Sequence, residues 1–228
     1  MKTLALILFL SFLLLGSGIR IAVADQIILE CVADAFICND DWADRNFGNP
    51  SSGFSPRAVG RQNEYTGQQI GRQLYRFEVP DWVSSATSAE LHIKVFDNFA
   101  GFPAETSVFG LSDDWQEMAV TWNTQPPHDS DLLDTVNAYC CGIVYVYDVT
   151  GYVQEQLGGG DMTICFIQRA PDESIIGGLR WFQRESDGHW VGDIQGESPK
   201  LYIYGEFTGV KNTTWGQIKA LYRTSRFD

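Results

Sequence analysis

The feature that most restricts how this chain folds is a two-residue alternation of large apolar and more polar side chains, repeated in short segments along its length. Neighbouring residues of an extended strand point to opposite faces, so each such segment buries one face and exposes the other. The clearest apolar sets are Tyr75/Phe77/Val79, Leu91/Ile93/Val95, Ile143/Tyr145/Tyr147, Ile164/Phe166 and Leu201/Ile203. Residues that favour turns, such as Gly, Pro, Asn and Asp, separate the segments. The pattern predicts an all-β, antiparallel, jelly-roll-like β-sandwich of about nine or ten strands.

Two segments have helical rather than alternating spacing. Val149 to Leu157 predicts a short helix, with Thr150 as a candidate N-cap and Gly158 just beyond its C-terminus. We expect this helix to close one end of the sandwich. Residues 208–228 form a tail with apolar residues at helical spacing, namely Trp215, Ile218, Leu221 and Tyr222. The tail is either a terminal helix that packs on the sandwich or a segment for sorting or surface attachment.

The N-terminus has the features of a secretory signal peptide. Lys2 precedes an apolar run from Leu4 to Leu15, and Ala22-Val23-Ala24 supplies the small residues of a cleavage site. The run is shorter than the roughly 20 residues of a membrane span. We therefore interpret residues 1–24 as a cleaved signal, with an uncut anchor as the alternative, and expect a single sandwich domain over residues 25–207.

Charge excludes one class of partner. The chain carries 29 acidic against 16 Lys and Arg residues, a formal net charge of −13. Binding to nucleic acid depends on clustered cations that release counterions from phosphates, so we expect no nucleic-acid partner. A secreted chain of this size that is rich in aromatic residues is instead compatible with glycan binding, because aromatic rings pack on the apolar faces of sugars.

The cysteines permit disulfides in an oxidising compartment, although their number is odd. There are five, at positions 31, 38, 140, 141 and 165. We expect Cys31 and Cys38 to form a bridge that closes a short loop at the edge of the domain. The histidines are scattered and no Cys-x-x-Cys pair occurs, so the sequence shows no zinc motif.

Two tryptophans in polar, loop-like stretches are candidate sugar-stacking residues. Trp190 follows His189, which is also a candidate ligand-binding residue, in a Gly-containing stretch over residues 186–193. Trp42 lies among acidic residues. Each ring either contacts a ligand or folds back into a small core of its own loop. Trp115 and Trp122, by contrast, are assigned to packing within the sandwich.

Arginine and aspartate side chains supply the remaining candidate site residues. Arg57, Arg180 and Arg184 are candidates for gripping the carboxylates or sulfates of an acidic glycan. The alternative for Arg184, and for Arg72 and Arg76, is pairing with nearby carboxylates of the chain itself. Four aspartates are candidate calcium ligands: Asp34, Asp40, Asp41 and Asp44. The alternative is that they are solvated surface charges.

A series of motifs carries a resemblance to a known family. Four stretches occur in a fixed order, at residues 71–79 (GRQLYRFEV), 114–123 (DWQEMAVTWN), 147–150 (YDVT) and 181–186 (WFQRES). Further matches are 33–36 (ADAF), 46–48 (NFG), 88–93 (SAELHI) and 198–203 (SPKLYI). The chain, from about Leu29 to Phe207, resembles the DNRLRE domain, also described as the family 96 carbohydrate-binding module and related to disaggregatase proteins. The resemblance implies a single β-sandwich and, for some members, binding of an acidic polysaccharide such as alginate.

The functional prediction is a secreted, non-catalytic module that binds a polysaccharide or a cell-surface glycan. No nucleophile elbow, phosphate loop or dinucleotide fingerprint occurs in the sequence. Two alternatives stay open: a structural protein of a cell envelope or matrix, and a polysaccharide-degrading enzyme whose carboxylates come from distant strands.

Overall fold

The computed structural model describes residues 25–48, 57–62, 69–98, 104–139, 141–173, 177–181, 184, 190–191, 193–205 and 207. The predicted signal peptide and the predicted tail at 208–228 lie outside these residues. The described elements are β1 (Asp25–Cys38), η1 (Asp40–Trp42), β2 (Arg57–Gln62), β3 (Gln69–Glu78), β4 (Ser88–Asn98), β5 (Ala104–Leu111), β6 (His128–Ala138), β7 (Val144–Asp148), α2 (Thr150–Gly159), β8 (Thr163–Arg169), β9 (Gly177–Trp181), β10 (Trp190–Val191), β11 (Ile194–Gln195) and β12 (Lys200–Gly205). All strand pairings among them are antiparallel.

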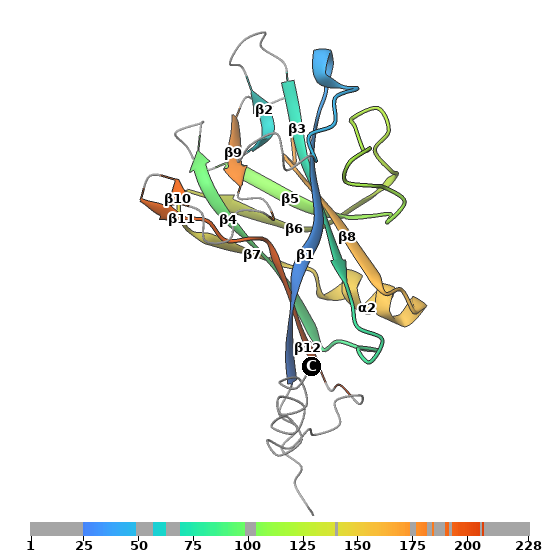
Figure 1. Ribbon diagram of the computed structural model, residues 1–228. Coiled ribbons are helices and arrows are strands. Elements are labelled where there is room, and N and C mark those ends of the chain that lie inside the picture. The colour runs from blue at the N-terminus through green and yellow to red at the C-terminus, as the bar shows by residue number, and fades with distance from the viewer. Residues whose placement is uncertain are drawn as a thin grey trace, which may run out of the picture.

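Apart from β10 and β11, which form a separate two-stranded sheet, the strands form two layers that share the long strands β1 and β4 (Figure 1). Sheet A has the order β1-β12-β4-β7 and uses the first half of β1 and of β4. Sheet B contains β6-β5-β8-β3, and the second half of β1 pairs with β3 on the side opposite to β8. The first residues of β3 also pair with β2, which lies across β3 from β1. β2 then pairs with β9, which also pairs with the second half of β4. The predicted all-β sandwich is confirmed.

The core lies between the two sheets and contains most of the alternating apolar residues. Leu91 and Ile93 from β4, and Leu201 and Ile203 from β12, are fully buried. They belong to one cluster with residues of sheet B, namely Tyr75, Phe77, Ile164 and Phe166. Burial of each such side chain stabilises the fold by roughly 1.5–3 kcal/mol. Ile143 is an exception, because it precedes β7 and is 45 % exposed.

A buried polar network joins the two sheets inside this core. The Tyr75 hydroxyl donates to Gln168 Oε1 at 2.8 Å, and Gln168 Nε2 donates to the Tyr147 hydroxyl at 2.9 Å. Tyr147 also hydrogen-bonds Thr106. Burial raises the pKa of both tyrosines, so both hydroxyls stay protonated and able to donate. These partners come from four strands, three in sheet B and one in sheet A, and fix how the sheets lie on each other.

The helix forms close to where the sequence predicts it, with different end residues. α2 begins at Thr150 with Val149 as the N-cap, and Gly160 ends it in the left-handed conformation at φ 85°. Thr150 is therefore the first helical residue, and Gly158 lies inside the helix. Glycine adopts the positive φ of a C-terminal cap without steric cost, which explains why the helix stops at the third of three glycines. Tyr152, Val153 and Leu157 pack into the core between the sheets.

Candidate functional site

The outer face of sheet A carries the residues that alternate with the core residues along each strand, and most of them are polar. The register aligns them in three cross-strand rows: Gln26/Tyr204/Ser88, Ile28/Tyr202/Glu90/Asp148 and Glu30/Lys200/His92/Val146. All of these residues are half-buried or exposed. We call this set the open face. It exists because the residues between them point into the core, so alternation sends these side chains to solvent.

Three ring side chains lie together on the open face, and we call His92, Tyr202 and Tyr204 the aromatic strip. The His92 and Tyr202 rings stack with centroids 4.0 Å apart. Gln26 Nε2 donates to the Tyr204 hydroxyl at 3.0 Å, and that hydroxyl lies 3.5 Å from Glu90 Oε2. Glu90 Oε2 is also 2.9 Å from His92 Nε2. The rings are thus held by neighbours that themselves carry hydrogen-bonding groups, an arrangement suited to a ligand with both apolar and hydroxyl surfaces.

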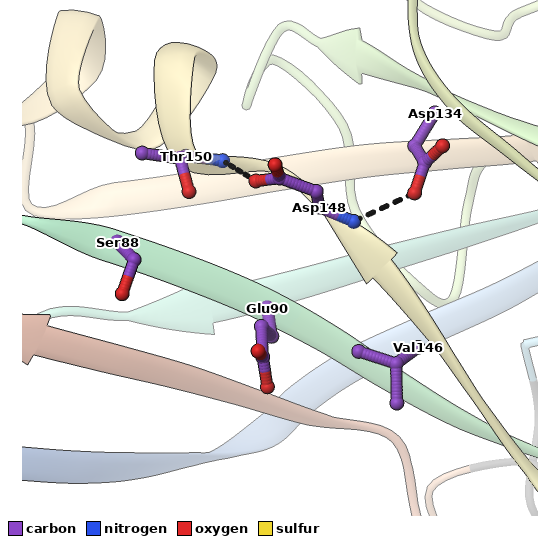
Figure 2. A pocket seen from close by; sticks show the side chains of 6 residues that line it. All are labelled: Ser88, Glu90, Asp134, Val146, Asp148 and Thr150. Atoms are coloured by element: carbon purple, nitrogen blue, oxygen red, sulfur yellow. Dashed lines mark hydrogen bonds between the residues drawn. The ribbon is translucent and has the colours of Figure 1, made fainter.

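A pocket of about 250 Å³ lies where the open face meets the start of α2. Its lining residues are Ser88, Glu90, Asp134, Val146, Asp148 and Thr150. Figure 2 shows Ser88 and Glu90 on β4, beside Val146 and Asp148 on β7, with Thr150 at the helix start and Asp134 across from Asp148. The pocket is therefore continuous with the aromatic strip through Glu90.

Backbone amides hold two of the pocket carboxylates in place. The Asp148 amide donates to Asp134 Oδ2 at 2.8 Å, and the Thr150 amide donates to Asp148 Oδ1 at 3.0 Å. Hydrogen bonds from Thr150, first from its side chain and then from its amide, lower the pKa of Asp148. Asp148 is consequently an anion at neutral pH, and its acceptor oxygens have a fixed direction.

The outer face of sheet B is closed by residues 112–127, which we call the cover segment. Trp115 and Val120 of this segment are buried in a cluster on the face opposite to the core, and Trp122 packs against it. The packing role predicted for Trp115 and Trp122 is confirmed. The sheet residues in this cluster are Ala33, Ala35, Ile37, Leu74, Phe109, Leu111, Cys165 and Ile167.

Arginines of sheet B lie against the rings of the covered face. The Arg72 guanidinium is 4.2 Å from the Trp122 ring centroid, and the Arg76 guanidinium is 4.5 Å from that of Trp115. Arg72 also makes a two-point contact with Glu173, at 2.7 and 2.8 Å. The alternative prediction of carboxylate pairing is confirmed for Arg72. Arg76 instead donates to backbone carbonyls of Asp113 and Trp115.

Of the three predicted ligand arginines, the structure describes the side chain of Arg184. Arg184 Nη2 lies 3.0 and 3.2 Å from the two carboxylate oxygens of Glu117, and Nη1 donates to the Val32 carbonyl at 2.9 Å. The pairing alternative therefore describes Arg184 as well, and its contact with a glycan stays a prediction. In the β2-β9 register Arg180 is aligned with Ala58 rather than with Arg57. The side chains of Arg57 and Arg180 lie outside the described residues.

The predicted stacking residues have different settings. Trp42 is 37 % exposed in η1, and its ring centroid is 5.8 Å from that of Phe47. The Arg45 guanidinium lies over both rings. Trp42 thus forms the small loop core that was its alternative prediction, while part of its ring faces solvent. The backbone of Trp190 pairs with β11, whereas its side chain and all of His189 lie outside the described residues.

The four aspartates predicted to hold calcium do not assemble. Asp34 is 3 % exposed and accepts hydrogen bonds from Gln73 Nε2 at 2.9 Å and from the Arg184 amide at 3.3 Å. Asp44 accepts from Asn123, while Asp40 and Asp41 belong to η1. Across the described part of the chain, no three acidic, His or Cys side chains are grouped so that they could hold a metal ion. The strand carries Asp34 into the protein interior, away from the exposed aspartates, which corrects the predicted site.

The predicted Cys31–Cys38 bridge is also wrong. Both residues lie on β1, and an extended strand separates positions seven residues apart by about 23 Å, far beyond disulfide reach. Cys31 Sγ lies 3.2 Å from the Ala33 carbonyl oxygen. The prediction assumed a loop where the chain continues as one strand.

Comparison with known proteins adds an independent observation. A search of curated proteins finds no match. The family model described as carbohydrate-binding module family 96 matches residues 26–190. β12, which carries Tyr202 and Tyr204, lies beyond the matched range and completes sheet A between β1 and β4. Because the match spans well over half of the 228 residues, the chain belongs to carbohydrate-binding module family 96.

Proposed function

We propose that this chain is a secreted, non-catalytic carbohydrate-binding module, built over residues 25–207, that holds a polysaccharide on the open face. The family supports carbohydrate binding as the function. The observation that favours this face is the aromatic strip on an exposed sheet, with a pocket at its end. Among the described residues, no helix is long and apolar enough to cross a membrane.

The chemistry of the open face matches that of a sugar chain. A pyranose has an apolar surface of C–H groups that packs on an aromatic ring, and a rim of hydroxyls that need partners. Tyr202 and Tyr204 supply rings two positions apart on β12, while Gln26, Ser88 and Glu90 supply amide, hydroxyl and carboxylate groups beside them. Such a site binds each sugar weakly, and copies of the module on a surface gain avidity.

The test is a glycan array with residues 25–228 and with the Tyr202→Ala/Tyr204→Ala variant. We expect the variant to lose at least about tenfold in affinity for every glycan that the unmodified protein retains, since burial of one aromatic side chain contributes roughly 1.5–3 kcal/mol. Tyr139→Ala is the matched control, because Tyr139 is 67 % exposed and lies outside the open face. Retention that survives in the double variant but is lost in Trp42→Ala or Trp190→Ala would instead place the site at η1 or at β10.

A further inference from the structure

We infer that the open face selects uncharged glycans and rejects polyuronates. This inference rests on the proposed function and concerns the class of sugar that the same site accepts. The distribution of charge around the aromatic strip carries it, and it runs against the acidic polysaccharide that the sequence resemblance implies.

The pocket end of the face offers acceptors and no cation. Its lining combines the carboxylates of Glu90, Asp134 and Asp148 with two hydroxyls and the apolar side chain of Val146. Two of these carboxylates are oriented by backbone amides, as described above. Ionised oxygens held in this way accept strong hydrogen bonds from hydroxyl groups, and Val146 offers a surface for sugar C–H groups. A uronate carboxylate in the same place would face like charges at close range.

The lysines near the strip do not reverse this balance. Lys200 Nζ lies 3.7 Å from Glu30 and 3.9 Å from Glu197, and Lys94 Nζ lies 3.9 Å from Glu197. Each cation is therefore accompanied by a carboxylate of the chain. The chain as a whole is also acidic, with a formal net charge of −13, so the long-range field adds to the repulsion of a polyanion.

Two described arginines that would suit a uronate contact carboxylates of the chain itself. Arg72 is held by Glu173 under the cover segment, and Arg184 is held by Glu117. Neither belongs to the rows of the open face. The face consequently presents hydrogen-bond acceptors to a polymer whose hydroxyls are the donors, which is the chemistry of a neutral hexose or pentose polysaccharide.

The experiment compares the same polysaccharide with and without its carboxylate charges. Alginate and polygalacturonate are each used before and after chemical reduction of their carboxylates to primary alcohols, together with xylan, mannan and soluble cellulose derivatives without charge. Affinity electrophoresis or calorimetry at low salt measures binding to residues 25–228. We expect retention by neutral or reduced polymers, and at least about tenfold weaker binding of the uronate forms.

Two variants locate the cause. Glu90→Gln/Asp148→Asn keeps an acceptor oxygen at each position and removes both charges. We expect it to reduce the ratio of the affinities for the reduced and the uronate polymer by at least about fivefold. Glu105→Gln/Asp114→Asn removes the same charges from exposed positions on sheet B and the cover segment, and should leave the preference unchanged. Melting curves verify that both variants are folded.

The outcomes separate the two proposals. A preference for the uronate forms that still depends on Tyr202 and Tyr204 would overturn the charge selection and leave the binding face intact. Binding that ignores both tyrosines, or no binding to any polymer, would overturn the proposed site itself. An equal shift in the two double variants would assign the effect to net charge and contradict the role of the pocket.

Discussion

The outer faces of the two sheets both carry aromatic side chains, but the face of sheet B is covered by the chain itself and the face of sheet A is exposed. On sheet B, Trp115 of the cover segment is only 6 % exposed, and the arginines of β3 lie against the rings of Trp115 and Trp122. On sheet A, Tyr202 and His92 stack on each other at the surface, and no residue of the three rows is buried. The same aromatic content therefore stabilises the fold on one face and stays available to a ligand on the other.

This difference explains why aromatic and arginine content alone is a poor guide to a glycan site. A guanidinium that lies on a ring and contacts a carboxylate has its donors occupied, as Arg72 does with Trp122 and Glu173. Hydrogen-bonding groups on the open face contact one another at its surface, where solvent can also reach them. A ligand on sheet A exchanges water for sugar hydroxyls, whereas a ligand on sheet B would first displace the cover segment.

The largest expected effect is on stability and belongs to the covered face. Trp115→Ala should lower the free energy of unfolding by about 3–5 kcal/mol, because a buried ring is removed from a packed cluster. Urea denaturation measures this value. Tyr202→Ala on the open face is the matched control and should change stability by no more than about 1 kcal/mol. Equal losses in the two variants would show that the faces are not energetically different.

A second comparison concerns ion pairs. Arg72 and Glu173 have side chains only 12 % and 17 % exposed, and a double-mutant cycle on them should give a coupling of about 2 kcal/mol. The open-face pair Lys200 and Glu30, with side chains 23 % and 59 % exposed, should give less than about 1 kcal/mol. Chemical denaturation of the single and double alanine variants measures both. A stronger coupling energy in the open-face pair would contradict the view that ion pairs stabilise the covered face more than the open face.

How far the sequence predicts this molecule depends on whether a property is local. Alternation at Leu91, Ile93, Leu201 and Ile203 identified the core, because neighbouring residues of a strand must point to opposite faces. The same pattern implies that Tyr202 and Tyr204 face outward, but not which outer face stays open. That depends on where residues 112–127 pack, which is decided by contacts distant in sequence.

The errors have the same origin. Cys31 and Cys38 are close in sequence, yet one strand holds them apart. Asp34 lies near the other predicted calcium ligands in sequence, but its side chain is buried and accepts a hydrogen bond from Gln73. Gln168 reads as a polar strand residue, and its burial follows only from its partners on three other strands. Proximity along the chain was mistaken for proximity in space in the first two cases, and the third needed the complete pairing of strands.

A smaller effect separates binding from folding on the open face. Tyr204→Phe removes the hydroxyl that accepts from Gln26 and keeps the ring. Affinity for a retained glycan should fall by about threefold to tenfold, which corresponds to the net contribution of one hydrogen bond, while stability changes by less than about 0.5 kcal/mol. Calorimetric titration and thermal melting measure the two quantities. Unchanged affinity would limit the role of Tyr204 to its ring.

The smallest predicted effect is a pH dependence at the edge of the open face. Hydrogen bonds from Thr150 lower the pKa of Asp148 in the folded protein. The carboxylate therefore contributes stability that is fully present above its unfolded pKa of about 3.9 and is lost as the pH falls through the lower folded value. Because Asp148 is exposed, solvent reduces the contribution to a few tenths of a kcal/mol. Asp148→Asn keeps an acceptor for the Thr150 amide but not the charge, so it should melt slightly below the unmodified protein at pH 6, and the difference should shrink as the pH falls below about 3.9. Asp114→Asn on the cover segment controls for the change in net charge. A difference in melting temperature between Asp148→Asn and the unmodified protein that grew toward low pH would contradict a stabilising role of the Asp148 charge.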